Sequence, residues 1–227
     1  MRKKKFKLGR EVNLLDVYPK SKRPIKGRAK SVTVEDRLVA RRFGREYFDG
    51  TRNQGYGGYN YHPRFWQPVV KRMAKYYNLD KNSRVLDVGC GKGFMLHDFR
   101  EIIKGITVAG IEISEYAVQN SLEDVKPFIQ VGNAKKLPYA DNTFDLVIAI
   151  NCLHNLPIED CFVAFQELER VSRKHKFVIN DAYRNQKEKE KMLQWNLTGI
   201  TYFSTKDWKN FFKLSGYTGD FYWFIAE

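Results

Sequence analysis

The sequence predicts an α/β fold built on a doubly wound, mostly parallel sheet of six or seven strands, with a basic N-terminal arm. From Arg84 onward, short apolar runs alternate with amphipathic stretches, which is typical of parallel strands buried on both faces and their crossover helices. The first of these runs ends in a glycine-rich turn. A length of 227 residues with 43% hydrophobic content suits one such domain and is too apolar for a disordered chain.

Strands and helices are expected to alternate along the second part of the chain. Apolar runs predict strands at residues 84–89, 107–113, 127–132, 144–151 and 176–181. Amphipathic spacing predicts helices at residues 63–78, 93–103, 114–123, 159–172, 186–196 and 205–215. After residue 215 the chain is long enough for one more strand, and ITYF at 200–203 could supply another. Because ligands of such folds bind at the carboxyl ends of the strands, the site is expected there.

The positive charge is concentrated in the first part of the chain. Residues 1–52 carry 17 Lys and Arg against 6 Asp and Glu, a net charge of +11, whereas residues 53–227 carry 23 against 20, a net charge of +3. Residues 1–30 have few apolar side chains and no sustained periodicity, so we expect an extended arm that docks on the body. The chain is therefore divided into an arm with a lid segment, residues 1–62, and a ligand-binding domain, residues 63–227.

A short helix and a glycine-rich aromatic segment are expected to join the arm to the domain. The stretch SVTVEDRLVARRFGREYF offers Ser31 or Thr33 as an N-cap, acidic residues in the first turn and apolar residues at helical spacing. In the following DGTRNQGYGGYNYHPRFW, the glycines disfavour regular structure, yet the aromatic residues are too many for a solvated linker. Tyr56, Tyr59 and Tyr61 either cover a ligand as a lid or tie the arm to the domain surface.

Membrane and secreted classes are disfavoured. No run approaches the roughly 20 apolar residues that span a bilayer, and MRKKKFKLGR lacks the apolar stretch of a secretory signal. Cys90, Cys152 and Cys161 lie in apolar segments without a CxxC pair, which argues against disulfides and structural zinc. Histidines and carboxylates show no metal-ligand spacing, so no metal is expected. We expect a cytoplasmic protein with reduced thiols.

The most informative motif is VLDVGCGKGFML at residues 85–96. Its strand ends in Asp87, and Gly89, Gly91 and Gly93 follow at alternate positions before a helix begins. Glycine is required where a turn has positive φ or where the backbone approaches a ligand. The N-terminus of the helix would suit phosphate, but the carboxylate of Asp87 points to a ligand that carries a positive group.

An acidic residue also ends the second predicted strand. Glu112 follows Gly93 by 19 residues, about the spacing at which a carboxylate accepts both hydroxyls of a ribose. The ligand is therefore expected to contain a nucleoside. GCGKG is GxGxG instead of the dinucleotide GxGxxG, and no GxxxxGK[ST] is present for a nucleoside triphosphate. S-Adenosyl-L-methionine fits these features best.

Together with GNAKKLPYADNTFDLVIAINCLHNL at residues 132–156, these motifs resemble the class I S-adenosylmethionine-dependent methyltransferases, in particular the small methyltransferase-11-like group. The resemblance covers roughly residues 63–215 and implies that residues 63–227 bind the cofactor and transfer a methyl group. It implies that Glu112 holds the ribose and that Ile113 borders the adenine. Asn133 stands where the family usually has Asp. The cofactor residues that the resemblance implies are Asp87, Gly89, Cys90, Gly91, Gly93, Glu112, Ile113, Asn133, Ala134 and Asn151.

Candidates for the acceptor side follow the fourth and fifth predicted strands. A hydroxyl or protonated amine acceptor is helped by a general base, for which histidine is well suited. His154, in NCLHN, is the preferred base, with loop packing as its alternative, and His62 in the lid segment is the second candidate. Asp181 could orient the acceptor or cap the next helix. The candidate substrate contacts are Tyr56, Tyr59, Tyr61 and Tyr183.

Three functions remain in competition. The leading one is methyl transfer to an O or N atom of a small or medium acceptor, such as a sugar, a nucleotide-linked sugar or another metabolite, closed in by the aromatic lid. The second is methylation of RNA gripped by residues 1–30, because clustered Lys and Arg neutralise phosphates. The third is a non-catalytic cofactor-binding protein whose arm holds an acidic partner or an anionic membrane.

Overall fold

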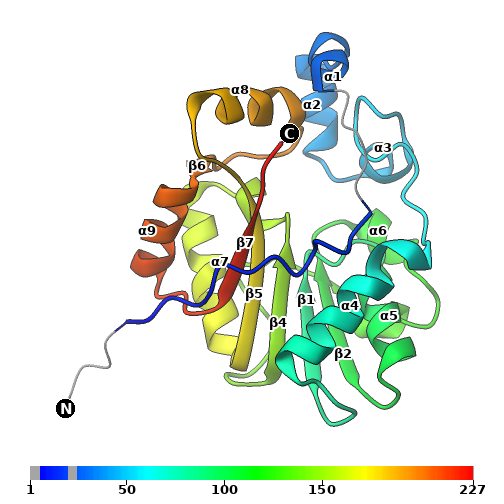
Figure 1. Cartoon of the computed structure of the whole chain (residues 1–227). Coiled ribbons are helices and arrows are strands. Elements are labelled where there is room, and N and C mark those ends of the chain that lie inside the picture. Colours follow the sequence, from blue (N-terminus) through cyan, green and yellow to red (C-terminus); the bar gives the residue numbers. More distant parts are fainter. Residues whose placement is uncertain (1–5, 20–24, 227) are drawn as a thin grey trace.

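A parallel sheet with helices on both faces organises the chain (Figure 1). The computed structural model describes residues 6–19 and 25–226. The strands are β1 (Arg84–Val88), β2 (Thr107–Glu112), β3 (Ile129–Val131), β4 (Phe144–Ile150), β5 (Ser172–Tyr183), β6 (Phe203–Ser204) and β7 (Asp220–Phe224). The helices are α1 (Ile25–Ser31), α2 (Val34–Ala40), α3 (Arg45–Asp49), α4 (Pro63–Tyr77), α5 (Phe94–Ile102), α6 (Glu115–Gln119), α7 (Ile158–Val171), α8 (Gln186–Trp195), α9 (Thr205–Ser215) and the 3₁₀ turns η1 (Lys126–Phe128) and η2 (Leu153–Asn155).

The sheet confirms the predicted doubly wound architecture. Its strand order is β3-β2-β1-β4-β5-β6, and β7 also pairs with β5, which makes seven strands. Each of these pairings is parallel. The connection direction reverses between β1 and β4, so a crevice opens at the carboxyl ends of these two strands, where ligands of such sheets bind. The ITYF stretch supplies only Phe203 to the two-residue strand β6, and the C-terminal strand β7 joins the sheet in parallel.

Two apolar cores lie on opposite faces of the sheet, because successive side chains of a strand point to opposite sides. Leu146 and Ile148 of β4 pack in the core formed with α4 and α5. Val147 and Ala149 of the same strand pack in the core formed with α7 and α9. All four side chains are fully buried. Burial on both faces explains why this strand reads as a continuous apolar run and not as an alternating one.

Some elements differ in length from the sequence prediction. Strand β3 begins only at Ile129, because Pro127 lies in η1 and has no N–H to donate to a strand ladder. Helix α6 ends at Gln119, short of the predicted residue 123. Strand β5 starts at Ser172, directly after α7, and is therefore longer than the predicted stretch from 176 to 181.

The N-terminal segment runs along the edge strand β7. Val12 N–H donates to the Phe221 carbonyl at 3.0 Å, and Phe221 N–H donates to the Arg10 carbonyl at 3.0 Å. The prediction of an extended arm up to residue 30 is wrong for Ile25–Ser31, which forms α1 because Ile25 is buried and the helix packs beside α8. Residues 1–5 and 20–24 of the predicted arm lie outside the described residues.

The helix predicted from Ser31 onward is split into two. Thr33 caps α2 in a capping box with Asp36, as its position suggested, but the helix ends at Ala40. Phe43 has a φ of 51°, a left-handed conformation that cannot continue a helix, and α3 starts two residues later. Phe43 thereby packs edge-on against Tyr47, with ring centroids 5.2 Å apart.

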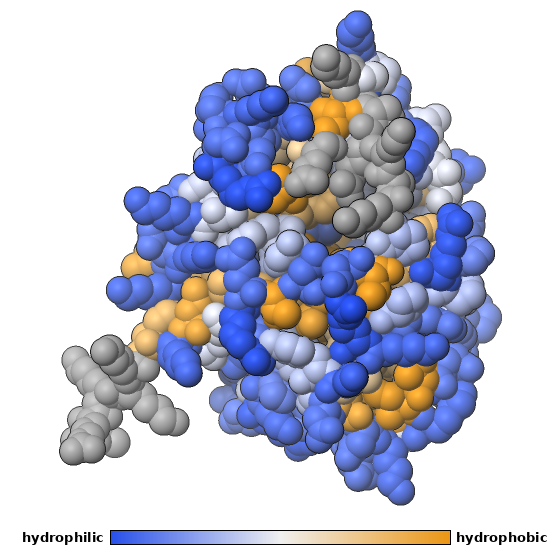
Figure 2. Space-filling model, in the orientation of Figure 1, coloured by the Kyte–Doolittle hydropathy of each residue, from blue (hydrophilic) through white to orange (hydrophobic). Residues whose placement is uncertain are grey.

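Helices α1 to α3 and α8 lie together above the carboxyl ends of the strands (Figure 1). Figure 2 shows a mainly hydrophilic outer surface over α8, whose Met192 is buried on the inner side. Among the helices of residues 6–19 and 25–226, none has both the length and the apolar character that crossing a bilayer demands.

Candidate active site

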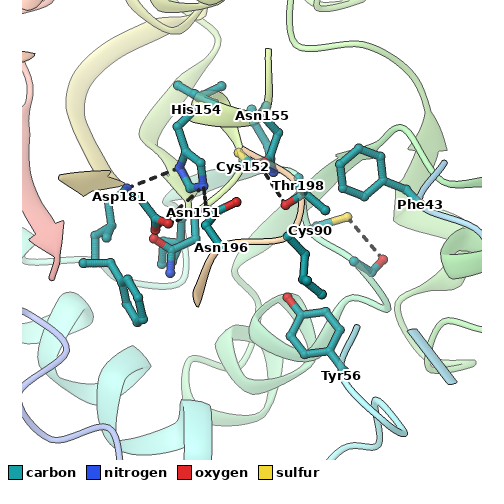
Figure 3. Close-up of a pocket in the computed structure, with 18 of the residues that line it drawn as sticks. Phe43, Tyr56, Cys90, Asn151, Cys152, His154, Asn155, Asp181, Asn196 and Thr198 are labelled. Atoms are coloured by element: carbon teal, nitrogen blue, oxygen red, sulfur yellow. Dashed lines mark hydrogen bonds and ion pairs between the residues drawn. The ribbon is translucent and has the colours of Figure 1, made fainter. Parts of the chain in front are cut away.

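A cavity of about 970 Å³ opens at the carboxyl ends of β1, β2, β4 and β5, beneath residues 25–62, which form its lid. Figure 3 shows part of its lining. Ligand pockets are usually about 300–1,000 Å³, so this one has room for a nucleoside cofactor and a second compact molecule. Most of the side chains that the sequence selects meet there. Those that line the cavity are Tyr56, Tyr59, Asp87, Gly89, Cys90, Gly91, Glu112, Ile113, Asn133, Ala134, Asn151, His154 and Asp181.

The glycine turn after β1 requires residues without a side chain. Gly89 has a φ of 79°, and a Cβ at this position would lie 2.6 Å from the Cβ of Cys152. Gly91 has a φ of 55°, and a Cβ there would lie 3.3 Å from the ring of Tyr59. Both backbone positions favour glycine on conformational grounds as well as for space. The turn therefore presents bare backbone to the cavity.

Glu112 is held in a fixed orientation at the end of β2. Its Oε2 accepts the Gly91 N–H at 2.8 Å and its Oε1 accepts the Ser114 N–H at 2.9 Å. Each carboxylate oxygen keeps acceptor capacity for a further hydrogen bond. Burial raises the pKa of Glu112, although these backbone donors oppose the shift. Because the Gly91 N–H is occupied and the Gly89 N–H donates to the Ile111 carbonyl, the turn has few donors left for a phosphate.

Asp87, at the end of β1, carries a buried carboxylate. Its side chain receives no hydrogen bond from any residue that the structure describes, and the residue is 5% exposed. Burial, with the nearby Glu112, raises the pKa of Asp87 to about 7. Lys92, the lysine of the glycine turn, is paired with Asp49 at 2.6 Å. Two desolvated carboxylates in one cavity favour a ligand with positive charge.

The lid is anchored on the glycine turn through α3. Asp49 accepts hydrogen bonds from Lys92 Nζ at 2.6 Å, from the Tyr116 hydroxyl at 2.7 Å and from the Tyr59 N–H at 2.9 Å. Tyr59 stacks on Phe94 with ring centroids 4.7 Å apart. Tyr59 therefore covers the turn at Gly91, and Tyr56 packs against Tyr59 with ring centroids 4.4 Å apart.

On the other side of the cavity, His154, Asp181 and Asn196 form a buried polar cluster (Figure 3). His154 Nδ1 accepts the Asp181 backbone N–H at 3.3 Å, which assigns the ring proton to Nε2. Nε2 lies 3.7 Å from Asp181 Oδ1. The Asn196 amide donates to Asp181 Oδ2, and its own carbonyl accepts the Gly199 N–H. Nδ1 of His154 is thus occupied by a backbone N–H, Nε2 lies near the carboxylate of Asp181, and Asp181 lines the cavity.

A family model described as a methyltransferase domain matches residues 79–216, which is more than half of the chain. The matched span contains the glycine turn, Glu112 and the His154 cluster. The chain belongs to the class I S-adenosylmethionine-dependent methyltransferases.

Individual methyltransferases resemble the chain at moderate identity. It is 28% identical over 171 residues to malonyl-[acyl-carrier protein] O-methyltransferase from Erwinia pyrifoliae, covering 74% of this chain and 59% of that protein. It is 32% identical over 129 residues to sterol 24-C-methyltransferase ERG6B from Gibberella zeae, covering 50% of this chain and 32% of that protein. The chain thus spans a third to three-fifths of the length of these relatives. The crystal structure of the YcgJ protein from Bacillus subtilis shares the fold, with a TM-score of 0.53, 19% identity and coverage of 64% of this chain and 66% of that one.

Four residues that the sequence selected lie outside the cavity lining. Gly93 caps α5 with a φ of 77°, and a Cβ there would lie 2.6 Å from Ile129 Cδ1, so it serves packing. His62 caps α4, its Nδ1 accepting the Arg64 N–H at 3.2 Å. The Tyr61 hydroxyl donates to Asp98 at 2.6 Å, and the ring of Tyr183 lies under Lys189.

The cavity is also lined by residues that the sequence did not indicate. Asn196 and Thr198 follow α8, and Phe43 comes from the irregular turn between α2 and α3. Asn13, Leu15 and Tyr18 reach the cavity from the N-terminal segment, and Arg28, Arg52 and Trp195 from the lid and α8. No motif marks these positions, because tertiary packing brings them to the cavity from separate segments.

Proposed function

We propose that this protein is a methyltransferase that binds S-adenosyl-L-methionine and transfers the methyl group to an O or N atom of a small or medium acceptor, such as a sugar, a nucleotide-linked sugar or another metabolite. One observation carries the proposal. A single lidded cavity joins the carboxylates of Asp87 and Glu112 to the cluster of His154 and Asp181. The first pair suits a cationic nucleoside, and the second can accept a proton from an acceptor.

The residues on the β1 and β2 side fit this cofactor. Asp87 would hold a positively charged group of the methionine moiety, since its carboxylate has no partner within the part of the chain that the structure describes. Glu112 would accept the ribose hydroxyls with the remaining lone pairs of its fixed oxygens. Ile113, Asn133 and Ala134 would border the adenine, Ile113 being 51% exposed and thus free to pack on a ring.

The residues on the β4 and β5 side would act on the acceptor. Bound S-adenosyl-L-methionine supplies an electrophilic methyl group on a sulfonium. Asp181 would accept the proton that a hydroxyl or ammonium acceptor loses, because its carboxylate lines the cavity. His154 would be a positioning residue, since its Nδ1 is already occupied and its Nε2 faces Asp181. The aromatic roof would keep water out while the acceptor is aligned.

The test is transfer of a labelled methyl group from S-adenosylmethionine to a panel of hydroxyl and amino acceptors. For the acceptor that is labelled, Asp181→Asn should lower kcat by about 10²- to 10⁴-fold while leaving the Kd of S-adenosylmethionine unchanged. His154→Gln should lower kcat less and shift its pH profile, because it disturbs only the orientation of Asp181. His62→Asn retains a helix cap outside the cavity and is the matched control, with unchanged kcat.

The same panel separates the competing functions. An RNA included in it should remain unlabelled, since the cavity is roofed and sized for compact molecules. If RNA alone were labelled, and the labelling were lost at high salt, the protein would be an RNA methyltransferase and the proposal would be wrong. Unchanged kcat in Asp181→Asn would remove the proposed base while leaving the transferase activity in place.

A further inference from the structure

Two arginines of the lid line the active-site cavity. Arg28 comes from α1 and Arg52 from the loop after α3. The carboxylates assigned to the cofactor lie at β1 and β2, whereas Arg28 contacts α8, which follows β5 at the other side of β4. The cavity is therefore acidic toward the cofactor and basic toward the lid and α8.

Both arginine side chains are held in position by neutral groups. The guanidinium of Arg28 lies over the ring of Trp195, 4.7 Å from its centroid, a cation–π contact. The Nε atom of Arg28 is buried and has no hydrogen-bond partner. Arg52 donates from Nη1 to the Tyr56 carbonyl at 2.5 Å. A buried donor without a partner is unfavourable, and a ligand that accepted its hydrogen bond would remove this cost.

No carboxylate compensates these charges. Among residues 6–19 and 25–226, neither Arg28 nor Arg52 takes part in an ion pair, whereas Lys92 in the same lid region is paired with Asp49. Burial, and then the nearby Arg52 and Arg37, lower the pKa of Arg28. The sequence KSKRP at residues 20–24, just before α1, contains no acid. Arg52 is exposed to solvent, whereas the half-buried charge of Arg28 is available for a ligand to neutralise.

A third arginine, Arg37, relates this region of the cavity to α8. Arg37 donates to the carbonyls of Leu193 and Asn196 at the end of α8, so its own hydrogen bonds are used in fastening the lid. The side-chain amide of the same Asn196 donates to Asp181. Arg28, which lies over Trp195 of α8, thus belongs to the wall that carries the proposed acceptor cluster, and Arg52 lies near enough to Arg28 to lower its pKa.

We propose that Arg28 and Arg52 bind an anionic group of the methyl acceptor, either a carboxylate or a phosphate. Arginine presents a planar fork of donors that matches both groups. This inference adds a negative charge to the acceptor of the proposed function. It rests on that function, because the bound anion is a methyl acceptor only if the protein transfers a methyl group. An anion bound by both side chains would contact α1 and the loop after α3 together.

Calorimetry on the full chain saturated with S-adenosylhomocysteine tests the site, with inorganic phosphate and acetate as separate probes and chloride as the background ion. Wild-type protein should bind at least one probe with a Kd on the order of 1 mM. Arg28→Gln and Arg52→Gln should each raise that Kd by roughly tenfold or more. Arg42→Gln, an exposed arginine of the same lid without an ion pair in the described part of the chain, is the matched control and should leave it unchanged.

The Kd of S-adenosylmethionine, measured for each variant, separates the explanations. It should stay within about twofold of wild type. A parallel loss of S-adenosylmethionine binding would assign the arginines to the carboxylate of the cofactor and overturn the proposal, as would anion binding that Arg42→Gln weakens equally. Failure of wild-type protein to bind S-adenosylmethionine would instead refute the proposed function, independently of the anion result.

Discussion

The buried carboxylate of Asp87 is predicted to destabilise the ligand-free protein near neutral pH. Its pKa in the folded chain is about 7, against 3.8 for an unperturbed aspartate. The difference of about 3 units corresponds to roughly 4 kcal/mol at 1.36 kcal/mol per unit. Well below pH 3.8 the group is protonated in the folded and unfolded states alike and adds no pH-dependent term. As the pH rises to about 7, the unfolded chain ionises first, so the folded state loses stability.

Replacing Asp87 by Asn removes this ionisation while keeping the shape of the side chain. The free energy of unfolding of Asp87→Asn should exceed that of wild type by up to about 4 kcal/mol at pH 8, and the gain should shrink toward pH 4. Urea denaturation of both ligand-free proteins at several pH values measures the difference. A difference that does not grow with pH, or a variant less stable than wild type at pH 8, would refute the electrostatic reasoning.

The same reasoning makes binding of S-adenosylmethionine dependent on pH. A cationic group binds the ionised carboxylate, so wild-type affinity should fall by up to tenfold per unit below about pH 7. In Asp87→Asn the affinity should be weak and nearly independent of pH in this range. Stability and ligand affinity are thus expected to change in opposite directions in one variant.

Three further variants test the turn and the lid. Gly89→Ala should lower the free energy of unfolding by about 2 kcal/mol or more, because its Cβ meets Cys152. Gly216→Ala is the control, also at a φ of 79° but with open space around it, and should lower the free energy of unfolding by only about 1 kcal/mol. Equal losses in chemical denaturation would contradict the packing argument. Gly93→Ala should be destabilised yet bind S-adenosylmethionine with an unchanged Kd. A Kd raised about tenfold in calorimetry would show that Gly93 belongs to the cofactor site. Asp49→Asn should free the lid, seen as faster proteolytic cleavage within residues 50–58, while the exposed-pair control Asp141→Asn should be cleaved at the wild-type rate.

The sheet and the cofactor half of the cavity could be predicted from the sequence because their signals are local. The run around Leu146 and the turn at Gly89 and Gly91 depend on burial on both faces and on positive φ, which act on consecutive residues. Glu112 lies at the same edge because parallel strands end together.

The acceptor half was less predictable because it depends on contacts between distant segments. His154 is selected by its place after β4, but its role changes once Asp181 N–H occupies Nδ1. Asn196 and Arg28 belong to no motif, and only the packing of α1 against α8 brings them to one wall. His62 serves as the N-cap of α4, because the first N–H groups of a helix need an acceptor. Its aromatic neighbours in the sequence suggested a place in the lid instead.

Calorimetric titration with S-adenosylmethionine tests the central claim most directly. Wild-type protein should bind one equivalent, and Glu112→Ala should raise the Kd by roughly 10- to 100-fold, because it removes charge-assisted hydrogen bonds to the ribose. Glu115→Ala, an exposed glutamate in the first turn of α6, should bind as wild type does. Wild-type protein without measurable affinity, or Glu112→Ala with unchanged affinity, would contradict the account of this cavity as a cofactor site.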